Sequence, residues 1–195
     1  MSVLNVGATA AYLENQRLVV ERIKEKYASD RKLDFDRLNE PVLWAKNPED
    51  VKILVKSFMV DEASQVDFLS DITAYDNVDQ EDGEQRFVLV IQLFSTLRHV
   101  RIRIKCLLAD GESALSLTDV FLGANWLERE VFDLFGIPFK GHPNLRRIMM
   151  DERFVGHPLR KEFPIKGRQG FSSNIEFNLG ANPLEVDTQL KEREV

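Results

Sequence analysis

The spacing of hydrophobic and polar residues predicts two helices in the first third of the chain. Residues 9–27 place Ala, Leu, Val and Ile between charged residues at helical spacing, which is typical of an amphipathic surface helix. A second helix is predicted to begin after Asn47, which can cap its N-terminus, with Pro48 in the first helical position. We expect four of its side chains to be buried together: Val51, Leu54, Val55 and Phe58.

Four later segments show the pattern of β-strands. Residues 41–45 form a short apolar run, and longer strands are predicted over residues 66–76, 86–95 and 99–108. In the last of these, apolar residues alternate with cationic ones. One side of this strand is expected to carry Val100, Ile102, Ile104 and Cys106, and the other Arg101, Arg103 and Lys105.

A third helix is predicted over residues 116–135. Ser116 and Asp119 have the spacing of an N-cap arrangement, and Gly136 followed by Pro138 is typical of a helix end. On a helical wheel the expected core stripe consists of Val120, Ala124, Leu127, Val131, Leu134 and Phe135.

The order of these elements indicates an α+β fold, with a mixed or antiparallel sheet and helices packed on one face. The folded domain is predicted to span residues 1–138. Residues 139–195, called the strap below, show little periodicity and hold four of the seven prolines. Because an irregular segment of this length usually binds a partner or is disordered, we expect a long extended C-terminal, partner-binding tail.

Composition restricts the possible functions. A chain of 195 residues that is 44% hydrophobic can form one ordinary domain with a core. Its apolar runs are too short to span a bilayer and its N-terminus lacks the features of a secretory signal, so we expect a cytoplasmic chain that meets a membrane only through a partner. Cys106 is the only cysteine, which excludes an internal disulfide and a four-cysteine cluster site.

The charge is divided unevenly along the chain. The net charge of −6 argues against a nucleic-acid-binding protein. Residues 140–168, however, contain eight basic and three acidic side chains, a net charge of +5, whereas the remainder contains 18 basic and 29 acidic ones, a net charge of −11. This division predicts a basic strap that lies on an acidic surface, either its own or a neighbour's.

The third predicted helix carries two acids, Glu130 and Asp133, on the same flank as Trp126. With His142 they could form the active site of a small hydrolase or isomerase. The alternative that we favour is structural, because two carboxylates at this spacing repel each other unless cations satisfy them. In that interpretation Arg146 and Arg147 fold back onto the acids and fix the path of the strap.

Two histidines, His142 and His157, each stand between Gly and Pro in the strap. They could ligate a metal, but the chain offers only His99 as a third histidine. We favour a role in turns, with each imidazole hydrogen-bonded to the backbone.

The segment "EREVFDLFGIPFKGHPNLRRIMMD", followed by "GHPLRKEFP", resembles the signature of the C-type subunit family of NADH-quinone oxidoreductase, the thirty-kilodalton subunit of respiratory complex I. A looser resemblance covers about residues 40–165. The matching positions are Glu128, Arg129, Glu130, Asp133, Phe135, Gly136, His142, Arg146, Arg147, Asp151, Gly156, His157, Pro158, Leu159, Arg160, Lys161 and Pro164.

The resemblance implies a subunit of the peripheral arm of a proton-translocating NADH-quinone oxidoreductase, on the cytoplasmic side of the membrane. It implies no cofactor in this chain, with FMN and iron–sulfur clusters in partner subunits. The implied partners are the forty-nine-kilodalton (D-type) subunit and the cluster-bearing (B-type and I-type) subunits. Related subunits serve ferredoxin- or F420-dependent dehydrogenases and membrane-bound hydrogenases, which remain alternatives. The predicted anchor and partner-binding residues are Trp126, Glu128, Arg129, Glu130, Asp133, His142, Arg146, Arg147, Asp151, His157, Arg160 and Lys161.

Overall fold

The fold is known from a computed structural model that describes residues 6–27, 29–77 and 85–164. The part of the strap beyond residue 164 lies outside the described residues. The elements are α1 (Val6–Tyr27), β1 (Leu33–Phe35), β2 (Pro41–Trp44), α2 (Pro48–Val60), β3 (Phe68–Asp76), β4 (Phe87–Ser95), β5 (Val100–Leu108), β6 (Ala114–Leu115), α3 (Ala124–Phe135) and β7 (Phe139–Lys140).

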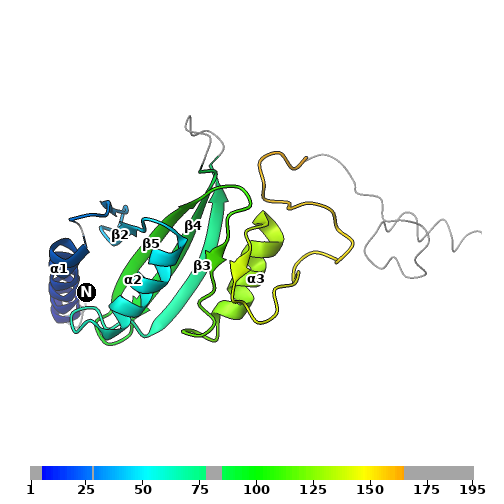
Figure 1. Cartoon of the computed structure of the whole chain (residues 1–195). Helices are drawn as coiled ribbons and strands as arrows, with labels where there is room; N and C mark the ends of the chain where they lie inside the picture. Colours follow the sequence, from blue (N-terminus) through cyan, green and yellow to red (C-terminus); the bar gives the residue numbers. More distant parts are fainter. Residues whose placement is uncertain (1–5, 28, 78–84, 165–195) are drawn as a thin grey trace, which may run out of the picture.

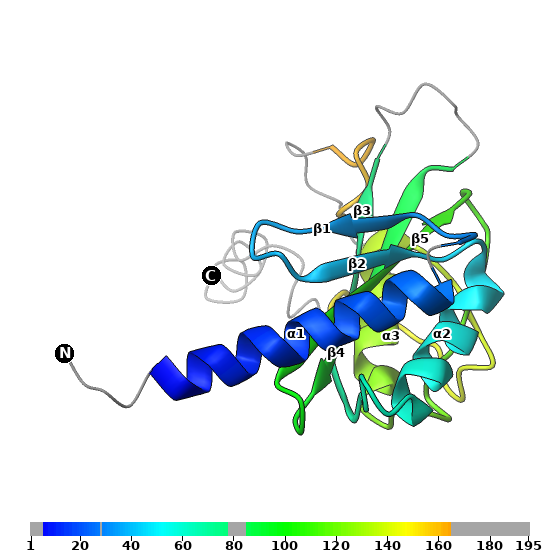
Figure 2. The same ribbon diagram turned by 90° about the vertical axis from the view of Figure 1, so that its left-hand side faces the viewer.

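Five strands form a mixed sheet in the order β1-β2-β5-β4-β3. The neighbours β2, β5, β4 and β3 can be followed in Figure 1, and β1 lies beside β2 in Figure 2. The β2–β5 pair is parallel, and the other neighbours in this sheet are antiparallel. The three-residue strand β1, which the sequence pattern did not reveal, extends the sheet by pairing Leu33 with Leu43. The predicted α+β class with a mixed sheet is therefore confirmed.

One hydrophobic core joins the helices to a single face of the sheet. The alternation in β5 is as predicted, because Val100, Ile102, Ile104 and Cys106 are all buried. Side chains from all three helices join the same cluster, including Ile23 of α1, which is 1% exposed. α2 lies across this face (Figure 1), and α1 extends its N-terminal half away from the rest of the fold (Figure 2).

Helix α2 begins as the sequence predicts. The Asn47 side chain accepts a hydrogen bond from the backbone N–H of Asp50 at 2.8 Å, and Pro48 occupies the first turn. The predicted stripe of Val51, Leu54, Val55 and Phe58 is buried.

Helix α3 is shorter than predicted, because it begins at Ala124 and not near residue 116. Ala114 and Leu115 instead form a parallel pair with β7, and the chain makes tight turns before the helix. The Ser116 hydroxyl closes a local turn by accepting from the Thr118 N–H at 3.2 Å, while Asp119 pairs with Lys52 at 2.7 Å. The predicted N-cap pair was thus wrong, because the same spacing of polar residues also suits such a turn.

Packing continues past residue 138, where the sequence placed the end of the domain. Phe139 is 4% exposed, belongs to the hydrophobic core and forms β7 with Lys140. The strap therefore leaves the core by way of a buried strand, which fixes where its next residues start.

Cys106 should be chemically inert in the folded chain. Its side chain is fully buried and burial raises the pKa of its thiol to about 12, so the nucleophilic thiolate is scarce near neutral pH. We expect negligible labelling by a thiol-specific alkylating reagent at pH 8 and complete labelling in denaturant, measured by mass spectrometry. Rapid labelling of the native protein would show that β5 is not packed as described.

Candidate functional site

The carboxyl end of α3 is where the strap docks. The last carbonyl oxygens of a helix lack partners within it. Gly136, in the left-handed conformation, donates its N–H to Phe132 O at 2.9 Å, and donors from the strap satisfy the following three carbonyls. These bonds join His157 Nδ1 to Asp133 O at 2.8 Å, Leu159 N to Leu134 O at 3.1 Å, and Arg160 Nε to Phe135 O at 2.6 Å.

Glycine is required at position 136 for two reasons. Its φ of +75° lies in the left-handed region, which other residues adopt only with strain. A Cβ atom there would also lie 2.6 Å from ring atoms of His157 and 2.8 Å from Arg160 Nη2. The helix end and the strap thus approach each other as closely as a side-chain-free residue permits.

Asp133 ties the middle of the strap to α3. Its fully buried carboxylate accepts three consecutive backbone hydrogen bonds at Oδ2, and its Oδ1 lies 3.2 Å from Arg147 Nη1. This second contact is an ion pair without hydrogen-bond geometry, since neither atom makes any hydrogen bond. The three backbone donors are Ile148 at 3.0 Å, Met149 at 2.7 Å and Met150 at 2.8 Å.

Arg129 holds the same segment from the preceding turn of the helix. It is 8% exposed and donates from Nε to Arg146 O at 3.0 Å and from Nη2 to Arg147 O at 3.1 Å. Its guanidinium also lies over the Trp126 ring, 5.0 Å from the centroid. Arg147 in turn donates to Gly156 O at 2.7 Å, which draws two parts of the strap together.

Glu128 and His142 fix the two segments that flank the start of α3. Glu128 is fully buried and accepts from the Leu117 N–H at 2.6 Å; burial raises the pKa of its carboxyl above the ordinary value. His142 donates from Nε2 to Asn125 O at 3.1 Å and accepts at Nδ1 from the Asn144 N–H at 3.0 Å. The predicted backbone-bonding role of His142 and His157 is therefore confirmed.

A network of charges fastens the far end of the described strap to the sheet. Asp76, whose side chain is fully buried, accepts two hydrogen bonds from Arg86 at 3.0 and 2.7 Å and one from the Lys161 N–H at 2.8 Å. Burial acts to raise the pKa of Asp76, but the hydrogen bonds from Arg86 and Lys161 outweigh it and hold that pKa below its usual value. Arg86 also pairs with Glu162.

Arg160 contacts both the end of α3 and the charge network at the far end of the described strap. Besides its bond to the helix, it pairs with Asp110 at 3.0 Å, and it lies over the Phe87 ring at 5.0 Å. Sequence reasoning missed Asp76, Arg86 and Asp110. The available signal was Asp76 itself, an acid at an inward-facing position of a predicted strand.

Five of the predicted site residues do not take part in the docking through their side chains. Glu130 and Arg146 are exposed, and no ion pair joins them among the described residues, so the predicted pairing of this arginine with the helix acids was wrong. Asp151 pairs with its neighbour Arg153, at 2.7 Å. The Lys161 side chain is exposed, as is Trp126 at 61%.

The acids and histidine of the hydrolase hypothesis do not converge. The Asp133 carboxylate is occupied by the strap, His142 is bonded to backbone, and Glu130 is exposed on the surface of the helix. A cleft of about 280 Å³ lies elsewhere, between α1 and the turns near residues 63 and 98, and none of the predicted site residues lines it.

Two general features hold over the described part of the chain. None of the helices there is long and apolar enough to cross a membrane. Within the same residues, no group of three or more His, Cys, Asp and Glu side chains is arranged to hold a metal ion.

Known proteins match this chain along most of its length. Residues 45–169 match the family described as respiratory-chain NADH dehydrogenase, 30 Kd subunit. The C-type subunit of NADH-quinone oxidoreductase from Geotalea uraniireducens (strain Rf4) is 40% identical over 155 residues, covering 79% of this chain and 90% of the relative. The protein of the same name from Francisella tularensis subsp. holarctica is 34% identical, covering 96% and 84%.

Two solved structures share the fold. A trypsin-resistant fragment (1-134) of Nqo5 superposes with a TM-score of 0.57 and 27% identity, over 66% of this chain and 99% of the fragment. A chain of the archaeal membrane-bound sulfane sulfur reductase superposes with a TM-score of 0.59, over 75% of this chain and 84% of its own, but at 21% identity it shows the fold alone.

The α+β domain is thus the framework that this chain shares with the two solved structures. The chain belongs to the thirty-kilodalton subunit family of respiratory-chain NADH dehydrogenase, which includes the C-type subunits of bacterial NADH-quinone oxidoreductases. It is therefore a peripheral subunit of a complex I-type assembly.

The two acids of α3 should respond very differently to loss of charge. Replacing Asp133 by Asn removes one partner of a buried ion pair, which costs about 3–5 kcal/mol of unfolding free energy. Replacing Glu130 by Gln changes an exposed site and should cost less than about 0.5 kcal/mol. Urea unfolding followed by circular dichroism measures both; equal effects would contradict the assignment of Asp133 as the anchor.

Asp76 should make stability depend on pH in the acid range. Because its pKa is lower in the folded chain than the ordinary value of about 3.9, its contribution is present above that pH and is lost as the pH falls through the folded pKa. We expect Asp76→Asn to lower the melting temperature at pH 7, and this difference to shrink as the pH falls below about 4, the ordinary pKa of an aspartate. A difference that is independent of pH would show that the carboxylate charge is not involved.

Proposed function

We propose that this chain is a non-catalytic subunit that serves assembly, and that it presents a preformed strap to its neighbours. The proposal rests on the contacts made by residues that match the family signature. Asp133, Arg129, His157 and Arg160 are all occupied in holding the strap on α3. Side chains used in this way leave no cleft of acids and bases for chemistry at this junction.

The neighbours that we propose are the forty-nine-kilodalton (D-type) subunit and the cluster-bearing (B-type and I-type) subunits. In this scheme FMN and the iron–sulfur clusters reside in those and other subunits, electrons pass from NADH to quinone through them, and this chain binds no cofactor. The chain lies on the cytoplasmic side of the membrane and meets the membrane only through the complex. The basic character of the strap supports contact with an acidic neighbouring surface.

Affinity purification from cells tests this proposal. A tagged full-length chain should recover subunits of the D, B and I types together with NADH–quinone activity. The purified chain alone should show no such activity and contain neither flavin nor iron. A soluble chain that purifies without partners, or that is active by itself, would contradict the proposal.

The Glu130→Gln variant is the matched control for a catalytic role. Because the Glu130 side chain is exposed and makes no hydrogen bond or ion pair in the described chain, its replacement should leave turnover per assembled complex unchanged. Full assembly with lost turnover would instead place Glu130 in the reaction.

A further inference from the structure

The outward side of the α3–strap junction exposes two large apolar side chains. Trp126 is 61% exposed and Met149 is 59% exposed, although both residues lie next to the hydrogen bonds that Arg129 and Asp133 make to the strap. Arg129 lies over the Trp126 ring, and the Met149 N–H is bonded to Asp133, further along the helix. Trp126 and the backbone of Met149 thus mark the two ends of a strip about 10 Å long on α3, from Trp126 to Asp133, at 1.5 Å per residue.

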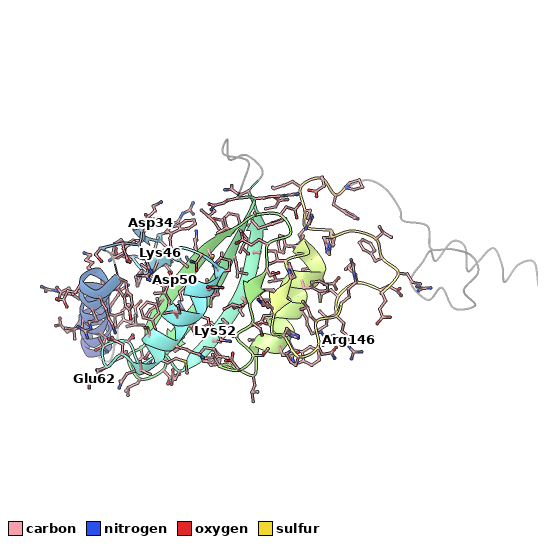
Figure 3. The ribbon with its side chains drawn as sticks, in the orientation of Figure 1. Asp34, Lys46, Asp50, Lys52, Glu62 and Arg146 are labelled. Atoms are coloured by element: carbon pink, nitrogen blue, oxygen red, sulfur yellow. The ribbon has the colours of Figure 1, made fainter. Side chains whose placement is uncertain are left out.

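A cationic residue, Arg146, lies next to this strip. The backbone carbonyl of Arg146 is bonded to Arg129, and its side chain lies on the side of α3 turned away from the sheet (Figure 3). Of the strap cations up to residue 164, Arg147, Arg153 and Arg160 have carboxylate partners within the chain. Lys140, Arg146 and Lys161 are exposed and have no such partner among the described residues.

We propose that Trp126, Met149 and Arg146 form a docking patch for a segment of a partner subunit that carries an acidic residue beside apolar ones. The inference rests on the proposed function and names the surface and the chemistry through which it acts. Charge complementarity favours an acidic partner segment. Arg146 is exposed and has no carboxylate partner among the described residues, whereas the neighbouring Arg147 is paired with Asp133. Exposed Trp and Arg are also the residue types that most often dominate binding energy at interfaces.

The patch is rigid before its partner arrives. Its backbone is fixed by the bonds to Asp133 and Arg129, so little conformational entropy remains to be lost on binding. Glu130, exposed on the same flank of α3, sets the orientation of the partner. An acidic side chain is attracted toward Arg146 and repelled from Glu130.

The test uses the tagged full-length chain in cells and measures the amount of assembly recovered. The double variant Trp126→Ala/Met149→Ala and the charge reversal Arg146→Glu should each reduce recovery about tenfold or more. Arg146→Lys, which retains the charge, should recover most of it. Since these side chains are exposed, each purified variant should melt within a few degrees of the wild-type temperature, and the Trp126 change removes only a cation–π contact with Arg129, which is weak at an exposed site.

Leu97→Ala is the matched control, because Leu97 is 65% exposed in the turn between β4 and β5, away from the patch. Recovery for the patch variants equal to that for Leu97→Ala would overturn the inference and leave the proposed function standing. Failure of the wild-type chain to recover any assembly would overturn both. Self-association of the purified chain that the patch variants abolish would show that the patch binds a second copy, which also contradicts the inference.

Discussion

The structure depends on a carboxylate placed where the helix itself is electronegative. Asp133 is buried in the last turn of α3, where the helix dipole and three carbonyls that have no partner within the helix already concentrate negative charge. Such a site is stable only if donors and cations surround it. The strap supplies three consecutive N–H groups, Arg147, and the donors of His157 and Arg160. Its basic character is therefore partly a requirement of the helix that it covers.

This constraint gives the strap two different sides. The inner side is bonded to α3, through Asp133, Arg129 and the carbonyls of the helix end. The outer side keeps exposed apolar and cationic groups that the fold does not use. A subunit organised in this way fixes the shape of its contact surface before it meets another protein, which lowers the entropy cost of assembly. Asp133, Arg129 and His157, which all belong to the family signature, are on the inner side and are bonded within the chain.

Much of the fold could be predicted from the sequence because it follows from periodicity. The alternation in β5 and the stripe of α2 both reappear as buried faces. The predicted start of α3 was wrong because polar residues at the spacing of Ser116 and Asp119 are compatible with a turn as well as with a helix cap. For the site, the predicted residues included seven whose side chains hold the strap or its flanking segments, but they also included five that do not, and they left out Asp76, Arg86 and Asp110. Helical spacing groups Glu130 with Asp133, but only the irregular path of the strap decides which acid becomes buried, and no periodicity describes that path.

The most direct test is amide hydrogen exchange on the isolated full-length chain, read at Ile148, Met149, Met150 and Leu159. These N–H groups are bonded to Asp133 and to the end of α3. The account predicts that they are protected in the absence of any partner, and that Asp133→Asn removes the protection at residues 148–150 first. Exchange at the rate of an unstructured peptide, while the amides of α3 remain protected, would show that the strap is not fixed by the helix and would contradict the account.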